Sequence, residues 1–351
     1  MDRNAKIYVA GHKGLVGSAM IRMLQSKGYA NLLTRSLEDL DLKNQQAVMD
    51  FFQTERPEYV FLAAAKVGGI LANSTFKAEF IYDNLVIATN VIEASYRSGI
   101  KKLLNLGSSC IFPKLAEQPL KESSLLTGLL EPTNEPYAIA KIAAIKLCRY
   151  YNEQYGTNFI SVMPTNLYGP GDNFDLQTSH VLPALTRKFH LAKLLTGRKF
   201  TEIRDDIRKR QIGFGLTLDR SASDAQAEQV LASIGIKPNA VTLWGTGSPF
   251  REFLFVNDLA EACVFLMETY DAKNIGEFVN IGFGTDVTIR ELASTVSSVV
   301  GFPGEILFDS SKPDGTPRKL LDSGRINELG WRPRTALAVG IRLGYEWYLS
   351  H

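Results

Sequence analysis

The 351-residue sequence has few cysteines and no long apolar run. Its three cysteines, Cys110, Cys148 and Cys263, are too few and too widely separated to predict a disulfide framework or a zinc site. We therefore expect a protein of a reducing, cytoplasmic compartment that holds no metal. The first residues do not read as a signal peptide, and no uncharged apolar stretch of about 18 residues predicts a membrane span.

An excess of either charge is also missing. Lysine and arginine number 39 against 37 aspartates and glutamates, which leaves a formal net charge of +2. This balance argues against a nucleic-acid or membrane partner, although a local basic cluster could still bind a small anion. With 45% hydrophobic and 22% charged residues, the composition is that of a globular, enzyme-sized protein of one or two domains.

Short apolar runs alternate with helical patterns through the first half of the chain. The expected strands are residues 7–10, 31–33, 59–63, 102–106 and 159–163, and the expected helices are residues 18–26, 45–54, 87–98 and 138–155. Strands that are apolar throughout and joined by helices predict a parallel sheet covered on both faces. The expected fold class is therefore α/β with a doubly wound, Rossmann-type sheet.

The alternation ends after the Gly169-Pro170-Gly171 turn, where we expect the chain to enter a smaller α+β domain. Within that part, residues of about 197–240 form a charged helical insertion. Ser223 as a cap, Gln226 three residues later and Gly235 as a stop predict a helix there. We interpret the insertion as a solvated surface excursion, with a flap near the substrate or a subunit contact as alternatives.

A glycine-rich segment follows the first expected strand and precedes a helix: Gly11-His12-Lys13-Gly14-Leu15-Val16-Gly17. Glycines at these places let the backbone approach a pyrophosphate, and the helix N-terminus favours negative charge. The segment therefore predicts a dinucleotide site. Lys13 and Arg35 favour the 2′-phosphate of NADPH, whereas Glu38 and Asp39 leave NADH as the alternative.

A second cluster carries groups that exchange protons. Ser108 and Cys110 stand at the end of a strand, where packing alone would be satisfied by valine. Tyr137 and Lys141 are four residues apart in a stretch that Pro136 can start as a helix, so their side chains share one face. We expect the lysine ammonium to lower the pKa of the phenol, and a modest lowering would make the thiol a proton acceptor near neutral pH.

Six motifs extend these two clusters: residues 10–18, 62–70, 106–111, 131–141, 163–170 and 311–319. Together they resemble the extended short-chain dehydrogenase/reductase family and, within it, the GDP-L-fucose synthases, over nearly the whole chain outside the insertion. The resemblance implies 3,5-epimerisation of GDP-4-keto-6-deoxy-D-mannose and NADPH-dependent reduction at C4. It also implies an NADP-binding domain of residues 1–168 and about 253–282, and a sugar-nucleotide domain of residues 169–252 and 283–351.

The resemblance further implies roles for individual residues. The catalytic residues would be Ser108, Cys110, Tyr137, Lys141 and His180, with Cys110 and His180 as the base and acid of the epimerisation. The cofactor would be bound by Gly11, His12, Lys13, Gly14, Leu15, Val16, Gly17, Arg35, Asp41, Leu42, Leu106, Gly107, Lys141, Pro164, Thr165, Asn166, Leu167 and His180. The GDP-sugar would be bound by Lys188, Trp244, Arg251, Asp314 and Lys319.

Two residues near the predicted cofactor site depart from the family pattern. Lys13 stands where many members have arginine, and Leu37 replaces a second cation, so the binding of a 2′-phosphate depends on Lys13 and Arg35.

The family resemblance also implies a homodimer, with an interface of the helices around residues 88–97 and 138–155.

Other functions compete with this interpretation. A reductase or epimerase/reductase of another GDP-4-keto sugar, such as a heptose, fits the same motifs. A 4,6-dehydratase fits less well, because Ser109-Cys110-Ile111 stand where its pattern has an Asp-Glu pair. A dinucleotide sensor without turnover would need neither the thiol nor the Tyr137–Lys141 pair.

Overall fold

The computed structural model describes residues 1–312 and 314–351, and the side chains of these residues except Ile70 and Leu71. Pro313, inside the 311–319 motif, lies outside the described residues, as does the side chain of Ile70 in the 62–70 motif.

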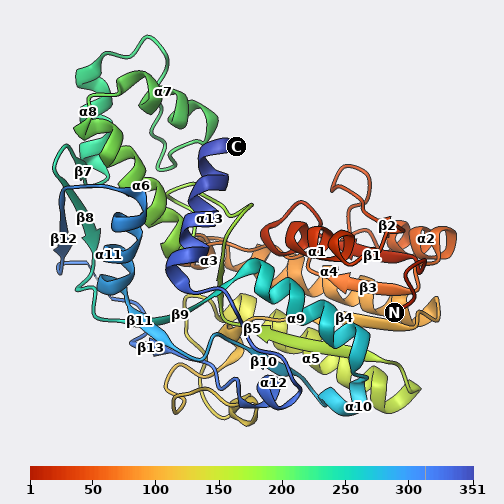
Figure 1. Ribbon diagram of the computed structural model, residues 1–351. Helices are drawn as coiled ribbons and strands as arrows, with labels where there is room; N and C mark the ends of the chain where they lie inside the picture. The colour runs from red at the N-terminus through yellow and green to blue at the C-terminus, as the bar shows by residue number, and fades with distance from the viewer. Residues whose placement is uncertain (313) are drawn as a thin grey trace.

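A six-stranded sheet organises the first half of the chain (Figure 1). In spatial order its strands are β10 (Val279–Ile281), β5 (Phe159–Pro164), β4 (Lys102–Leu106), β3 (Tyr59–Leu62), β1 (Ile7–Ala10) and β2 (Leu32–Leu33). Every neighbouring pair in it is parallel. The predicted doubly wound fold is confirmed, and the five predicted strands all belong to this sheet.

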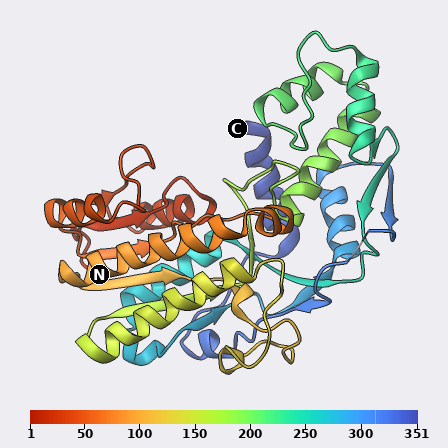
Figure 2. The same cartoon turned by 180° about the vertical axis from the view of Figure 1, so that it is seen from behind.

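Helices cover both faces of the sheet, because successive strand residues point to opposite sides. On one face, Ile7 and Val9 of β1 pack against α1 (Leu15–Ser26) and α9 (Val256–Thr269). On the other face, Tyr8 and Ala10 pack against three helices, which are α2 (Gln45–Glu55), α4 (Lys77–Arg97) and α5 (Glu135–Tyr155). Figure 2 shows α4 and α5 side by side on that second face.

The rest of the molecule contains two small sheets and several helices. One sheet has the order β12 (Glu305–Asp309), β8 (Ala240–Trp244), β7 (Ile236–Lys237), and the other has β11 (Asp286–Thr288), β9 (Phe250–Phe255), β13 (Arg318–Lys319), with β6 (Asn166–Tyr168) pairing with β9. The larger helices are α6 (Val181–Thr196), α11 (Ile289–Val300) and α13 (Leu337–Ser350). The short helices of the molecule are α3 (Ile70–Thr75), α10 (Ala272–Ile275), α12 (Gly324–Glu328) and the 3₁₀ turns η1 (Ser109–Ile111) and η2 (Glu122–Ser124).

The insertion contains α7 (Phe200–Lys209) and α8 (Asp224–Ser233) (Figure 1). The predicted helix is confirmed as α8, with a capping box between Ser223 and Gln226. The interpretation as a solvated excursion is wrong, since Phe200, Ile203, Ile207, Ile212 and Leu231 are buried in one core with residues of α6, α11 and α13. Most charged residues of α7, such as Asp205, Arg208 and Lys209, lie on its exposed side, whereas Asp206 is buried.

The division into two domains at the predicted boundaries stays a prediction. Within residues 283–351, Ile326 and Trp331 pack into the core beneath α1 and α9 and so belong with the large sheet. None of the helices in the described part of the chain is long and apolar enough to cross a membrane.

Candidate functional site

The glycine-rich segment forms a tight turn at the carboxyl end of β1. Gly11 has a φ of 82°, and a Cβ there would lie 2.7 Å from the backbone of Ala64. A Cβ on Gly17 would lie 2.1 Å from the Gly11 carbonyl oxygen. Gly14 is the N-cap of α1 and offers no side chain to the first amides of the helix. The turn therefore presents backbone N–H groups and a helix N-terminus to an anion, which fits a dinucleotide pyrophosphate.

His12 adds a polar atom to the same turn. Its Nδ1 is buried and has no hydrogen-bond partner among the described residues. Because buried polar atoms are normally paired, this nitrogen is available to a bound group. We infer that the turn fits the cofactor implied by the fold.

The two cations predicted to hold a 2′-phosphate both face carboxylates. Arg35 Nη2 lies 2.5 Å from Glu55 Oε1, and its guanidinium stacks on Phe51 at 5.2 Å from the ring centre. Lys13 Nζ lies 3.9 Å from Glu38 Oε2, and both side chains are exposed. Arg35 is thus positioned by α2, and its charge is partly balanced before any ligand binds.

Most of the other predicted cofactor residues lie at strand ends or in loops at the carboxyl edge of the sheet. The Leu42 carbonyl accepts a hydrogen bond from Asn90 Nδ2 at 2.9 Å, and Asp41 Oδ1 accepts one from the Lys43 amide at 2.9 Å. A Cβ on Gly107 would lie 2.0 Å from Met163 Cε, so only glycine fits between β4 and β5 there. Residues 164–167 continue from β5 into β6 at the same edge.

The proton-exchanging residues come together where β4 ends and α5 begins. Ser108 Oγ accepts a hydrogen bond from the Cys110 amide at 3.4 Å, as the cap of a 3₁₀ turn. Lys141 Nζ donates to the Leu106 carbonyl at 2.7 Å and lies 5.7 Å from the ring centre of Tyr137. The predicted helical face therefore holds the lysine against the strand end and the phenol beside it.

Burial dominates the protonation of this cluster. It raises the pKa of the Tyr137 phenol, and the nearby Cys110 thiol raises it further while the Ser108 hydroxyl opposes the shift. The expected lowering of the phenol's pKa is wrong for the free protein, because burial of the phenol itself raises that pKa, and burial also lowers the pKa of Lys141 to about 8. Burial likewise raises the pKa of the Cys110 thiol, against the expected lowering.

Two lysines act against the burial of the thiol. Lys319 and Lys141 both lower the pKa of Cys110, Lys319 more strongly. Lys319 also lowers the pKa of His180, where burial is again the larger cause. His180 is the N-cap of α6, and its surface is accessible to solvent although protein surrounds it densely. A thiol, an imidazole and a phenol from three distant segments are thus electrostatic neighbours around Lys319 and Cys110.

The predicted substrate-binding residues differ in exposure and in whether their polar groups already have partners within the protein. Lys188 Nζ donates to the Ile234 carbonyl at 2.8 Å, and burial lowers its pKa to about 8. Trp244 is 66% exposed at the end of β8, with Lys312 5.8 Å from the centre of its ring system. The Asp314 carboxylate is already bonded to Thr246, at 2.9 Å to the amide and 2.6 Å to the hydroxyl. Asp314 therefore anchors its own loop.

Arg251 and Lys319 lie on adjacent paired strands. In the register of β9 with β13, Arg251 stands opposite Lys319. Burial lowers the pKa of Arg251, and Asp314 opposes the shift. Two cations at neighbouring positions suit a diphosphate, for which charge-assisted hydrogen bonds are the strongest recognition.

Glu252 is a site residue that the sequence reasoning missed. It is fully buried, its Oε1 accepts from the Gly284 amide at 2.7 Å, and its Oε2 accepts from the Leu321 amide at 3.0 Å. It thereby fixes the chain just after Lys319. An acidic residue within an apolar strand, as in Arg251-Glu252-Phe253, was the available signal, because a buried carboxylate needs specific partners.

Arg187 precedes Lys188 in the sequence but does not belong to the candidate site. It is fully buried and pairs with Asp206 of the insertion at 3.0 Å. The described residues also show no group of three or more His, Cys, Asp or Glu side chains arranged to hold a metal.

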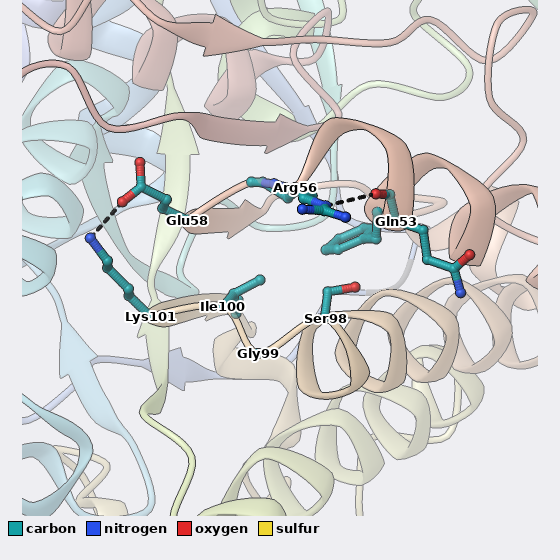
Figure 3. Close-up of a pocket in the computed structure, with 9 residues that line it drawn as sticks. Gln53, Arg56, Glu58, Ser98, Gly99, Ile100 and Lys101 are labelled. Carbon is teal, nitrogen blue, oxygen red and sulfur yellow. Dashed lines mark hydrogen bonds and ion pairs between the residues drawn. The ribbon is translucent and has the colours of Figure 1, made fainter.

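A separate cavity of about 540 Å³ lies at the opposite, amino edge of the sheet (Figure 3). It is lined by residues that precede β3 and β4, including Arg56, Glu58 and Lys101. Figure 3 shows Lys101 paired with Glu58, at 2.5 Å. The candidate site belongs to the carboxyl edge, where ligands bind in open α/β sheets, and not to this cavity.

Comparisons with known proteins agree with the geometry. Residues 7–214 and 217–282 match the family described as NAD dependent epimerase/dehydratase. A GDP-L-fucose synthase of Arabidopsis thaliana is 52% identical over 350 residues, which cover 100% of this chain and 95% of the relative. One from Escherichia coli is 47% identical over 352 residues, with 99% and 97% covered. A solved GDP-D-glycero-L-gluco-heptose synthase from Campylobacter jejuni, in the presence of NADPH, has a TM-score of 0.91 at 42% identity and covers 99% of both chains.

Proposed function

This chain belongs to the NAD dependent epimerase/dehydratase family and, within it, to the GDP-L-fucose synthases, and from this premise we propose that it converts GDP-4-keto-6-deoxy-D-mannose to GDP-L-fucose. The conversion inverts C3 and C5 of the sugar and then reduces C4. The protein is thus an oxidoreductase with epimerase activity that uses a nicotinamide cofactor.

The arrangement around Cys110 is the observation that carries the proposal. A simple ketoreductase needs a serine, a tyrosine and a lysine near its cofactor, and Ser108, Tyr137 and Lys141 supply these groups. It has no need of a thiol that is influenced by two ammonium groups, with an imidazole near one of them. The additional thiol and imidazole suit a reaction in which protons leave and return to carbon.

Epimerisation moves a proton from one face of a sugar carbon to the other. The C4 ketone acidifies the hydrogens on C3 and C5. In the proposed mechanism, the Cys110 thiolate takes the proton, the C–H electron pair forms an enolate, and His180 donates a proton to the opposite face. The Ser108 and Tyr137 hydroxyls donate hydrogen bonds to the enolate oxygen. Since burial raises the pKa of the thiol, the ammonium of Lys319 is needed to favour the thiolate.

Reduction uses the same hydroxyls. A nicotinamide cofactor held at the glycine-rich turn of residues 11–17 would supply the hydride for C4. Tyr137 then donates its proton to the C4 oxygen, and its raised pKa keeps it protonated and ready at neutral pH. Lys141, held by the Leu106 carbonyl, stabilises the resulting phenolate.

NADPH in preference to NADH is part of the proposal. Lys13 in the glycine-rich turn and Arg35 after β2 provide the cations, and the solved Campylobacter jejuni relative was determined in the presence of NADPH. Glu55 and Glu38 compete with the phosphate for these cations, so the preference is expected to be less strict than with free cations.

The test follows both half-reactions of the purified protein. With GDP-4-keto-6-deoxy-D-mannose, NADPH oxidation is measured by absorbance, and deuterium entry from D₂O at C3 and C5 is measured by mass spectrometry. Tyr137→Phe should slow reduction at least about 100-fold, because the proton donor for C4 is lost, while deuterium still enters more slowly, because the Ser108 hydroxyl still stabilises the enolate. Cys110→Ala should suppress deuterium entry. The proposed separation of roles is wrong when both variants lose both processes equally.

A second candidate is favoured by one observation. The solved relative with a TM-score of 0.91 is named for a GDP-heptose product. A GDP-4-keto heptose, with one more carbon than the deoxyhexose, would present the same ketone to the same residues. Comparing kcat/KM for the two GDP-keto sugars decides between the candidates.

A further inference from the structure

The insertion reaches the segment that carries His180. We call residues 173–180 the His180 segment; it leads directly into α6. This segment is compact, since Asp175 Oδ1 accepts from the Gln177 amide at 3.0 Å and from the Thr178 amide at 2.8 Å. On one side, the Gly69 amide donates to the Thr178 carbonyl at 2.9 Å. The loop after β3 therefore supports one side of the segment.

The insertion supports the His180 segment through its residues 211–215. The Phe214 amide donates to Gln177 Oε1 at 2.6 Å. A Cβ on Gly213 would lie 2.6 Å from Gln177 Cβ, so the two segments of the chain are in direct contact. Gly213 and Phe214 have φ of 84° and 57°. A left-handed phenylalanine persists only where its surroundings impose it.

The same loop is rooted in the buried cluster around Arg187. Arg187 Nη1 donates to the Gln211 carbonyl at 2.8 Å and to the Phe174 carbonyl at 3.0 Å. One guanidinium thus joins the insertion to the start of the His180 segment. Ile212, next along the loop, is fully buried.

A later part of the insertion, at Ile234, contacts Lys188. The Ile234 carbonyl, which accepts from Lys188 Nζ at 2.8 Å, is the C-cap of α8. The insertion therefore contacts the surroundings of a predicted proton donor through its residues 211–215, and a predicted substrate-binding cation through Ile234.

We propose that the insertion is a positioning element of the active site, and that Gln177 is the positioning residue through which it holds His180. The proposal rests on the proposed function, because it assigns His180 to proton transfer. Proton donation to carbon requires the imidazole within hydrogen-bond reach of one face of the sugar, and a displacement of about 1 Å at a reacting group can reduce a rate about 100-fold. A segment held from both sides meets that requirement.

The experiment uses three variants of the full chain. Gln177→Leu removes the acceptor for the Phe214 amide, and Gln177→Glu keeps an acceptor oxygen. Gln229→Leu makes the same change on the exposed surface of α8 and serves as the matched control. Deuterium entry at C3 and C5 should fall at least about tenfold in Gln177→Leu, recover in Gln177→Glu and stay unchanged in Gln229→Leu. Gln177→Ala replaces Gln177→Leu if the latter does not fold.

A readout without substrate separates this proposal from the function. The chain has four histidines, so ¹³C-labelled histidine spectra resolve the titration of His180. Burial and Lys319 lower the pKa of His180 in the native protein. Loss of the support should let the imidazole move away from the surrounding protein and from Lys319, and so raise that pKa in Gln177→Leu alone. Unchanged titration together with unchanged deuterium entry overturns the proposal. A raised pKa in a protein that turns over neither GDP-keto sugar retains the positioning role and rejects the function.

Discussion

At the scale of single residues, burial decides protonation more than charged neighbours do. Cys110 and Tyr137 both have raised pKa values although Lys141 is close to each, because the desolvation of the charged forms outweighs the attraction. Burial lowers the pKa of Lys141, because the charged form that loses hydration is here the protonated one. In the free protein the thiol and the phenol are thus held in their neutral forms, and the substrate must supply the partner for their charged forms.

Asp172 permits a direct test of this effect away from the proton-transfer residues. Burial raises its pKa to about 7 from 3.8, and Oδ2 is buried without a partner among the described residues. The folded protein therefore binds a proton more tightly than the unfolded chain, and this stabilisation is full below pH 3.8 and is lost as the pH rises to 7. Asp172→Asn should abolish this loss, up to about 4 kcal/mol.

Urea denaturation at pH 5 and pH 8 measures the difference. Relative to the native chain, Asp172→Asn should gain unfolding free energy between the two pH values. Asp219→Asn, which alters an exposed carboxylate of the insertion, is the control and should show no such gain. An equal pH dependence of Asp172→Asn and the native chain would show that Asp172 is ionised in both states.

At the scale of elements, the insertion is joined to the substrate end by a buried ion pair. Arg187 is fully buried, and Asp206 of α7 accepts from its Nε at 3.0 Å and also from the Tyr348 hydroxyl of α13. Such a pair is weak evidence of net stabilisation, but removing one partner leaves a buried charge uncompensated. The pair therefore specifies how α6, α7 and α13 meet.

Arg187→Leu should lower the free energy of unfolding by about 3–5 kcal/mol and expose residues 197–240 to proteolysis first. Arg208→Leu, which removes an exposed partner of Asp205 on α7, should change it by less than about 1 kcal/mol. Urea denaturation and limited proteolysis of both variants give the comparison. Similar stability of the two variants would mean that apolar packing alone holds the insertion.

At the scale of the whole molecule, α4 and α5 leave apolar side chains in solvent. Tyr82 of α4 is 62% exposed, and Ile139 and Tyr150 of α5 are 41% and 52% exposed. Ile139 and Tyr150 are eleven residues apart, about three helical turns, so they lie on one face. This surface is where the family resemblance predicts a homodimer, and we propose that it is the interface.

Ile139→Glu combined with Tyr150→Glu should convert a dimer to a monomer, because two charges would be buried at the contact. Light scattering coupled to size exclusion measures the mass. Leu349→Glu, at a residue 54% exposed on α13, is the control and should leave the dimer intact. A native chain that is already monomeric, or a double variant that remains dimeric, contradicts the assignment.

The sequence alone predicted much of the fold because the relevant signals are local. The strands at 7–10 and 102–106 coincide with β1 and β4, and the cap at Ser223 begins α8 as expected. The helix predicted from residue 87 is shorter than α4, which begins at Lys77 and packs on α5. The interpretation of the insertion as a solvated excursion was wrong because its burial depends on packing against α6, α11 and α13, and local periodicity does not encode those contacts.

The sequence by itself determined the parallel sheet, the glycine turn and the residue types of the site. Hydrophobic periodicity, glycine spacing and functional groups are local properties of the sequence. Only the tertiary structure decided that burial reverses the expected pKa of Tyr137 and Cys110, that Glu252 fixes the chain beside Lys319, and that the insertion supports the His180 segment. Desolvation and long-range contacts depend on residues far apart in the chain, and these become neighbours only when it folds.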